Sequence, residues 1–204
     1  MTPTGRSNRS TGKARPHVVA VSGSRRDGSY TRRGLEEALG GSEAAGGTTE
    51  LLDLADLQLP PLDPSTDPPG DSETVRRTIR EADAVVLGTP MYHGSYSGVL
   101  KNALDYCRFD EFEDTTVGLL VVSGGAFPMP ALDHLRAVCR SLNAWVLPHQ
   151  AAVPRARSAF DESGFTDDDL RDRVRTLGTR AVEFAAIEPG RAPTIVCQEV
   201  GPES

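Results

Sequence analysis

Three glycine- and serine-rich segments carry the residues whose types and spacing point to chemistry. They span residues 22–31, 88–107 and 123–127, and each follows a short run of apolar, mostly β-branched residues. Such runs predict buried strands, so each segment is expected to begin where a strand ends. In α/β proteins the carboxyl ends of parallel strands form the ligand-binding edge of the sheet. The three segments are therefore predicted to meet at one edge.

The first segment, SGSRRDGSYT, has the composition of a phosphate-binding loop. Unpaired backbone amides at a helix start favour an anion. The hydroxyls of Ser24, Ser29 and Thr31 add hydrogen-bond donors, and Arg25 and Arg26 offer guanidinium groups that match phosphate geometry. Any strand-to-helix turn collects glycine and serine. Two arginines and three hydroxyls within eight residues favour the phosphate site over that simpler explanation.

Two other phosphate loops do not fit this segment. Gly23 and Gly28 have the spacing of Walker A glycines, but that loop continues with Lys and then Ser or Thr, where this chain has Ser29 and Tyr30. No glycine lies two residues after Gly23, so the GxGxxG pattern of nicotinamide-binding Rossmann domains is absent. The sequence therefore indicates neither an ATPase nor a Rossmann dehydrogenase.

The overall composition predicts one domain and disfavours membrane, nucleic-acid and metal partners. A length of 204 residues with 38% hydrophobic content fills one domain better than two. No apolar run is long enough to span a bilayer, so we expect no membrane association. The net charge of −7 disfavours nucleic acid as a partner. The three cysteines are far apart and lack metal-ligand spacing, so we expect reduced thiols in a cytoplasmic protein and no metal site.

The elements that must position the three segments alternate between strand and helix. Apolar runs predict strands at residues 17–23, 48–54, 83–90, 115–125 and 144–148. Apolar residues at helical spacing predict helices at 30–41, 72–82, 97–107, 131–143 and 166–186, the first ending at Gly40 and Gly41. This alternation predicts an α/β fold with a doubly wound parallel sheet. We expect one domain at residues 17–187, a disordered basic leader at 1–16 and a C-terminal tail at 188–204.

The first two segments resemble the NADPH-dependent FMN reductase family, also called the flavodoxin-like NAD(P)H-dependent reductases. That family has a GSxRxxSxN phosphate loop followed by a PxYxxSxxGxLKNxLD segment. The matching residues here are Gly23, Ser24, Arg26, Ser29 and Thr31, then Pro90, Tyr92, Ser95, Gly98, Leu100, Lys101, Asn102, Leu104 and Asp105. The resemblance covers roughly residues 17–187. It implies a flavodoxin-like three-layer sandwich with a five-stranded parallel sheet in the order 2-1-3-4-5 and helices on both faces.

The resemblance also implies that non-covalent FMN occupies the predicted cleft. The residues implied to hold its phosphate are Ser24, Arg26, Ser29 and Thr31, and Tyr30 is also expected to contact the cofactor. Those implied to line its isoalloxazine ring are Pro90, Met91, Tyr92, His93 and Gly94, with Ser123, Gly124 and Gly125 on the far side. Hydride is expected to pass to flavin N5, so no catalytic side chain is predicted.

The activity implied by the resemblance is that of an FMN-dependent oxidoreductase. It would take hydride from NADPH or NADH and reduce a small-molecule acceptor such as a flavin, a quinone, an azo compound or a metal oxyanion, with ping-pong kinetics. A homodimer or homotetramer is implied as well. Two alternatives stay open, a flavodoxin-type electron carrier without nicotinamide oxidase activity and a binding module that has lost flavin. Carrier flavodoxins usually have a threonine-rich phosphate loop without arginines, which favours the reductase.

Overall fold

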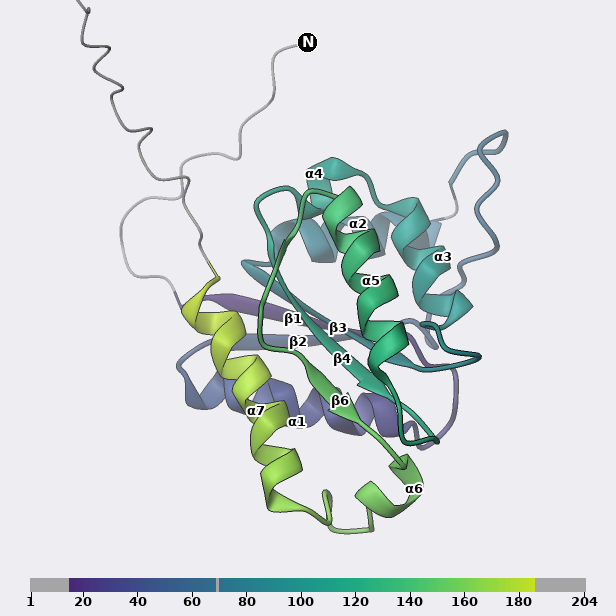
Figure 1. Ribbon diagram of the computed structural model, residues 1–204. Coiled ribbons are helices and arrows are strands. Elements are labelled where there is room, and N and C mark those ends of the chain that lie inside the picture. Colours follow the sequence, from purple (N-terminus) through teal and green to yellow (C-terminus); the bar gives the residue numbers. More distant parts are fainter. Residues whose placement is uncertain (1–14, 69, 186–204) are drawn as a thin grey trace, which may run out of the picture.

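A parallel β-sheet runs through the protein, with helices packed on both of its faces (Figure 1). The structure is a computed structural model that describes residues 15–68 and 70–185. The strands are β1 (His17–Ser22), β2 (Thr48–Asp53), β3 (Ala84–Pro90), β4 (Thr116–Val122), β5 (Trp145–Val146) and β6 (Ala151–Val153). They follow the order β2-β1-β3-β4-β5, and β6 also pairs with β4. The predicted flavodoxin-like strand order is confirmed.

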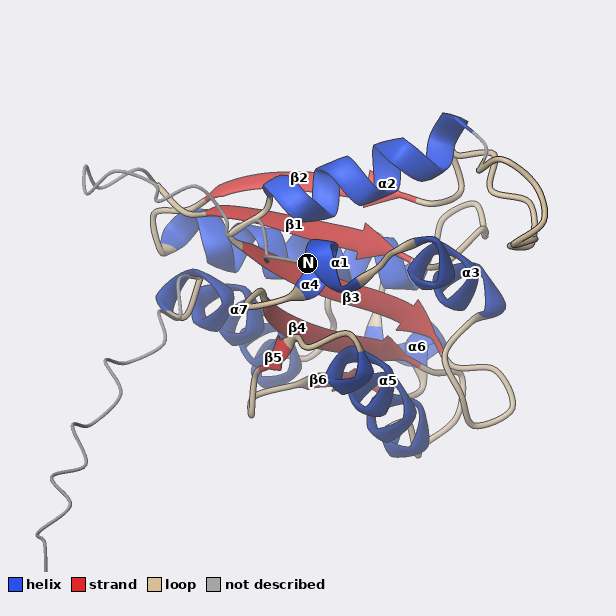
Figure 2. Ribbon diagram, turned by 90° about the horizontal axis from the view of Figure 1, so that it is seen from above, coloured by secondary structure: helices blue, strands red, loops and turns tan. Residues whose placement is uncertain are grey.

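Two layers of helices enclose the sheet, as Figures 1 and 2 show. One layer contains α2 (Gly70–Glu81), α3 (Gly98–Tyr106), α4 (Phe109–Phe112) and α5 (Met129–Ser141). The other contains α1 (Tyr30–Ala44), α6 (Ala156–Ala159) and α7 (Asp168–Glu183). Within the described ranges, no helix is long and apolar enough to cross a membrane.

The central strands supply side chains to both layers. In β1, Val19 and Val21 belong to the core beneath α2, α3 and α5, whereas Val18 and Ala20 belong to the core beneath α1 and α7. Successive side chains of a strand point to opposite faces, so a strand covered on both sides must be apolar throughout. This explains why the sequence shows continuous apolar runs rather than an alternating pattern.

The first helix does not end at Gly40 and Gly41 as predicted but continues to Ala44. The glycines permit close packing against α7: a Cβ at Gly41 would collide with the backbone of Arg175, and one at Gly178 would collide with the backbone of Ala38. The helix ends at Ala44, and Gly46, two residues later, has φ +91° and donates to the carbonyl of Glu43 at 2.9 Å. Gly41 is therefore a packing residue and not a helix stop.

The predicted fifth strand, 144–148, is interrupted. β5 ends at Val146, and the sheet edge resumes at β6, a strand that the sequence did not predict. Val146 pairs with Val117 of β4, and Ala151 pairs with Leu120 of β4. The edge strand therefore has more residues between these two pairs than β4 has, and the extra residues bulge out of the ladder. β6 then continues the sheet to its carboxyl edge.

A buried carboxylate joins α2 to α4. Glu111 has 0% exposure and accepts hydrogen bonds from Arg76 Nε at 3.1 Å, from Arg80, and from the backbone amide of Arg108 at 2.7 Å. Burial acts to raise the pKa of Glu111, but the Arg108 amide and the two guanidinium groups outweigh it and hold the pKa below its usual range. The carboxylate is structural, because it lies within this network.

The predicted leader and tail fall almost entirely outside the described residues. Of the leader, Arg15 and Pro16 are described. Arg15 donates to the carbonyl oxygens of Gly46 and Gly47, at 2.9 Å each, and Pro16 accepts from the amide of Thr48 at 2.8 Å. These two residues thus contact the turn between α1 and β2.

Candidate functional site

The loop after β1, residues 23–29, is held between two neighbouring elements. The amide of Gly23 donates to the carbonyl of Gly88 at 2.8 Å, and its carbonyl accepts from Ser97 Oγ at 2.6 Å. A Cβ at Gly23 would lie 2.7 Å from the Cβ of Leu100, so only glycine lets the loop pack so closely on the start of α3. The first two predicted loops are therefore in direct contact.

The same loop leads into the N-terminus of α1. Ser29 is the N-cap, and its Oγ accepts from the amide of Arg32 at 3.3 Å. Ser24, Ser29 and Thr31 are buried residues, each less than a tenth exposed. The first amides of a helix lack partners within the helix, and its dipole favours negative charge there. This corner is chemically suited to a phosphate.

A cleft of about 340 Å³ opens at this corner. Its lining comes from the loops after β1, β3 and β4, from the first residues of α1 and from α6. The lining residues are Ser24, Arg26, Ser29, Tyr30, Thr31, Pro90, Met91, Tyr92, Val122, Ser123, Gly124, Ala156 and Arg157. The volume falls in the range of small-molecule sites. The cleft therefore lies at the carboxyl ends of β1, β3 and β4, the edge that the sequence predicted.

Aromatic contacts order one side of the cleft. The ring of Tyr30 stacks on Phe160 with a centroid distance of 5.3 Å and an interplanar angle of 16°. Phe160 in turn contacts Phe165, with centroids 4.2 Å apart. The guanidinium carbon of Arg26 lies 5.7 Å from the centroid of the Tyr30 ring. Arg26 is thus positioned at the cleft by stacking on an aromatic side chain that is itself held in place.

The loop after β3 forms a two-residue hairpin. Tyr92 and Ser95 exchange backbone hydrogen bonds of 2.9 and 3.0 Å, with His93 and Gly94 at the tip. His93 has φ +49° and Gly94 has φ +80°, the left-handed geometry that such a tight turn requires. The amide of Met91 donates to the carbonyl of Val122 at 2.9 Å, which fixes the base of the hairpin beside β4.

The loop after β4 exposes backbone to the cleft. Ser123 Oγ donates to the carbonyl of Gly125 at 2.7 Å and closes a tight turn. A Cβ at Gly124 would meet nothing within 4 Å, so there is open space beside this backbone. The amide of Ser123 donates to Val153 at 2.9 Å, and that of Ala156 donates back to Ser123 at 2.9 Å. β6 therefore places α6 next to this loop.

Ten of the thirteen predicted site residues line the cleft together. The other three are His93, Gly94 and Gly125, which the structure places outside its lining. Arg25, considered with Arg26 as a phosphate ligand, lines a different pocket. Val122, Ala156 and Arg157 line the cleft but were not predicted.

Arg157 is the most important of these additions because it brings a second guanidinium to the cleft. It lies on α6, which follows β6. In the sequence, only the short apolar run before Pro154 points to β6, and this run is too brief to predict a strand from spacing alone. Without β6, the position of Arg157 beside the cleft could not be predicted.

The remaining titratable groups do not suggest nucleophilic or metal chemistry. Burial raises the pKa of both Cys107 and Cys139 to about 12, so these thiols are protonated near neutral pH. Among residues 15–68 and 70–185, no cluster of three or more His, Cys, Asp or Glu could hold a metal ion.

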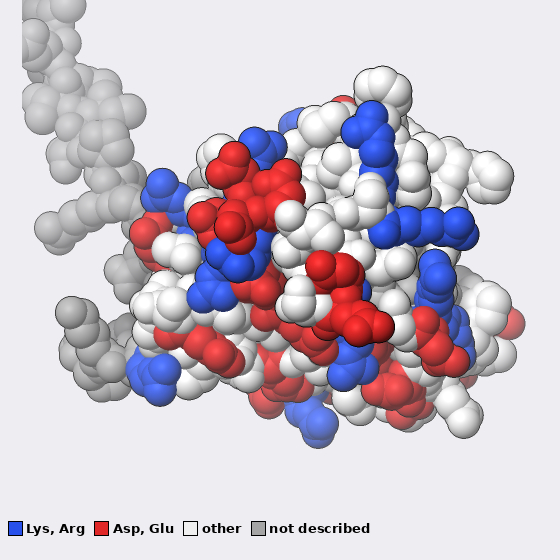
Figure 3. All heavy atoms as spheres, turned by 90° about the horizontal axis from the view of Figure 1, so that it is seen from below, with Lys and Arg blue, Asp and Glu red and all other residues white. Residues whose placement is uncertain are grey.

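Acidic and basic side chains are interspersed on the face that includes α1 and α7 (Figure 3). Several of them pair, including Arg175 with Glu37 at 2.6 Å and Arg180 with Glu183 at 2.6 Å. Pairing of this kind leaves little net positive charge there to attract a polyanion.

Comparison with known proteins establishes the family. The sequence profile described as NADPH-dependent FMN reductase matches residues 16–158. The chain belongs to this family. Over 150 residues it is 37% identical to the FMN-dependent NADPH-azoreductase of Staphylococcus aureus, covering 69% of this chain and 79% of that protein. The resemblance drawn from the two loops is confirmed, and so is the expectation of an oxidoreductase.

Solved structures share the fold of this NADPH-dependent FMN reductase family member. An NADH:FMN oxidoreductase, EMOB, in its apo form matches with a TM-score of 0.72 at 24% identity, covering 85% of this chain and 92% of that one. FerB, a flavoenzyme NAD(P)H:(acceptor) oxidoreductase from Paracoccus denitrificans, matches with a TM-score of 0.70 at 20% identity, covering 83% and 97%. At these identities the similarity supports the architecture.

Proposed function

We propose that this protein is an FMN-dependent NAD(P)H oxidoreductase that holds FMN in the cleft beside the N-terminus of α1. Its acceptor is proposed to be a small molecule such as a flavin, a quinone, an azo compound or a metal oxyanion. The family supports the cofactor and the class of reaction. One observation carries the assignment to this cleft: two guanidinium groups, a helix N-terminus and an open glycine wall converge on it.

The α1 corner of the cleft fits a phosphate monoester. Ser24, Ser29 and Thr31 line it and are buried residues, so an anion bound among them would be partly shielded from water. Arg26 and Arg157 line the same cleft and carry the charge that such an anion needs. These five side chains, with the first amides of α1, are the proposed phosphate ligands.

The other half of the cleft fits a flat ring. Pro90, Met91 and Tyr92 line one side and come from the loop after β3, whereas Ser123 and Gly124 come from the loop after β4. The open space at Gly124 lets a planar group approach the backbone closely. Tyr92 is 56% exposed, so its ring is available for packing.

Bound FMN would supply hydride acceptance and electron transfer, and the residues of this chain bind and orient it. The stacked Tyr30 and Phe160 pair keeps the phosphate corner rigid, and the short hairpin at Tyr92 keeps the ring wall in place. Phe127, the last residue of the third loop, is 81% exposed, and Met129 just beyond it is 48% exposed. We propose that this apolar surface contacts the acceptor or a second subunit of a homodimer or homotetramer.

The test is an anaerobic titration of purified protein reconstituted with FMN. Addition of NADPH or NADH is expected to bleach the visible flavin absorbance, and a quinone or azo acceptor is expected to restore it. Steady-state kinetics with both substrates varied should then give the parallel lines of a ping-pong mechanism. If dithionite reduces the bound flavin but neither NADPH nor NADH does, the protein is an electron carrier instead.

A further inference from the structure

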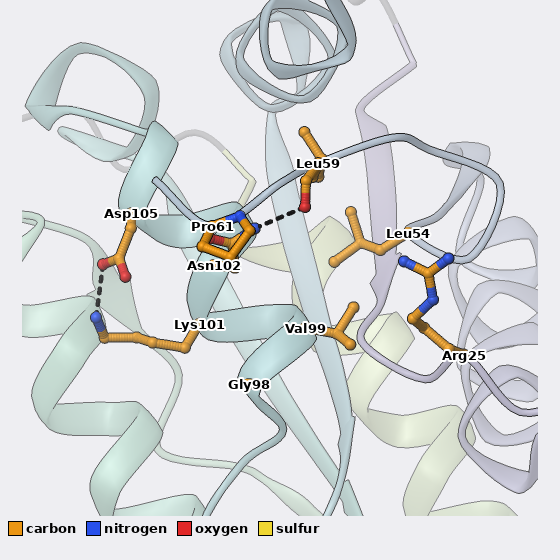
Figure 4. Close-up of a pocket in the computed structure, with 9 residues that line it drawn as sticks. All are labelled: Arg25, Leu54, Leu59, Pro61, Gly98, Val99, Lys101, Asn102 and Asp105. Atoms are coloured by element: carbon orange, nitrogen blue, oxygen red, sulfur yellow. Dashed lines mark hydrogen bonds and ion pairs between the residues drawn. The ribbon is translucent and has the colours of Figure 1, made fainter. Parts of the chain in front are cut away.

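A second pocket lies between the loop after β2 and the start of α3 (Figure 4). Its volume is about 420 Å³, and it shares no lining residue with the FMN cleft. The residues that matter for its chemistry are Arg25, Leu54, Leu59, Pro61, Gly98 and Val99. Arg25 and Arg26 are adjacent in sequence but line different pockets. The loop after β1 therefore separates two sites.

The wall of this pocket that the loop after β2 forms is held in place by α3. Asn102 Nδ2 donates to the carbonyls of Leu59 and Pro60 at 3.0 and 2.9 Å, and Asn102 Oδ1 accepts from the amide of Leu62 at 3.0 Å. Tyr106 Oη donates to the carbonyl of Pro60 at 2.8 Å. Four hydrogen bonds thus hold the proline-rich loop against the helix, so the pocket is preformed.

The two ends of the pocket differ in charge. At one end Lys101 pairs with Asp105 at 2.5 Å, so this positive charge is compensated. At the other end lies Arg25, beside Leu54 (Figure 4). Within the described part of the chain, the Arg25 guanidinium has no ion pair or hydrogen bond. Gly98, the first residue of α3, also lines the pocket, and the positive end of the helix dipole lies there.

We propose that this pocket binds a small organic anion with a flat apolar body, such as an aromatic carboxylate or sulfonate. The anionic group pairs with the guanidinium of Arg25, whose planar fork suits such oxygens. The apolar body lies against Leu54, Leu59 and Val99. The proposal does not depend on the FMN assignment, because the two sites share no lining residue.

The test compares two probes that differ in charge, 2-naphthalenesulfonate and neutral 2-naphthol. Both are titrated by calorimetry into the full-length protein, before and after saturation with FMN. The sulfonate is expected to bind one site per chain in both states. Arg25→Gln is expected to raise the Kd for the sulfonate about tenfold and to leave the Kd for 2-naphthol within about twofold, since only the charged hydrogen bond is removed.

Arg77→Gln is the matched control, because this exposed arginine on α2 lines neither pocket. It should leave both affinities unchanged. The proposal is overturned if FMN abolishes sulfonate binding, which would place the probe in the cleft. It is equally overturned if Arg25→Gln binds both probes as the wild type does, or if the wild type binds no sulfonate because a second copy of the chain covers the pocket.

Discussion

Replacing Arg26 with glutamine tests the phosphate site directly. Arg26 lines the cleft and stacks on Tyr30, whereas its neighbour Arg25 lines the other pocket. The two variants Arg26→Gln and Arg25→Gln remove the same charge from adjacent positions of one loop. They differ only in which pocket loses it, so a general effect of net charge cancels in the comparison.

The expected magnitude follows from the exposure of Arg26. A hydrogen bond to a charged group contributes about 1.5–3 kcal/mol when it is well desolvated. Arg26 is exposed at the rim of the cleft, so solvent screening reduces its contribution to about 1.4 kcal/mol. That free energy corresponds to about a tenfold rise in the Kd for FMN. Arg157→Gln should raise the Kd for FMN by a similar factor, and the double variant should raise it about a hundredfold if the two groups act independently.

The assay is quenching of flavin fluorescence on titration of the apoprotein. Riboflavin serves as the matched ligand because it has the ring and the ribityl chain but no phosphate. Arg26→Gln is expected to raise the Kd for FMN and to leave the Kd for riboflavin within about twofold of the wild-type value. Arg25→Gln should leave both Kd values within about twofold of wild type. Equal losses for riboflavin and FMN, or an Arg25 variant as impaired as the Arg26 variant, would refute the placement of the phosphate.

Three further outcomes test the packing and the titratable groups. Glu111→Gln should lower the free energy of unfolding by about 2 kcal/mol at neutral pH. Because the pKa of Glu111 is lowered in the folded state, its contribution to the free energy of unfolding is present above the unfolded-state pKa and disappears as the pH falls through the folded-state pKa. Urea unfolding curves of the variant and the wild type should therefore converge in acid, and a difference that does not change with pH would contradict this. Gly178→Ala should cost about 3 kcal/mol by thermal denaturation, whereas Gly70→Ala, with open space at its Cβ, should be nearly neutral, and equal effects would rule out the close helix contact. Cys107 and Cys139 should resist iodoacetamide in the folded protein and react after unfolding, as peptide mass spectrometry would show; rapid labelling of native protein would disprove their burial.

Local patterns in the sequence were sufficient for most of the fold and of the cleft. Continuous apolar runs mark strands that are buried on both faces, and β1, β3 and β4 have this character because helices cover them on both sides. The predicted helix at 97–107 is confirmed as α3, where Ser97 is the N-cap and its Oγ accepts from the amide of Leu100 at 3.1 Å. The loops after these strands meet because parallel strands end at one edge.

Where sequence reasoning failed, a contact between distant segments had decided the structure. Gly41 is a typical helix stop in isolation, but its missing side chain admits the backbone of α7 from more than a hundred residues away. Arg157 reaches the cleft only because β6 resumes pairing with β4 after an interruption that periodicity does not encode.

The sequence by itself determined the family, because the two loop motifs that carry the resemblance consist of residue types within short windows, and the strand order followed from that resemblance. The tertiary structure alone decided that Arg25 and Arg26 serve different pockets and that His93 sits at a turn tip outside the cleft lining. The physical reason is that the direction of a side chain in an irregular loop depends on which distant elements pack against that loop, and adjacency in sequence does not specify this packing.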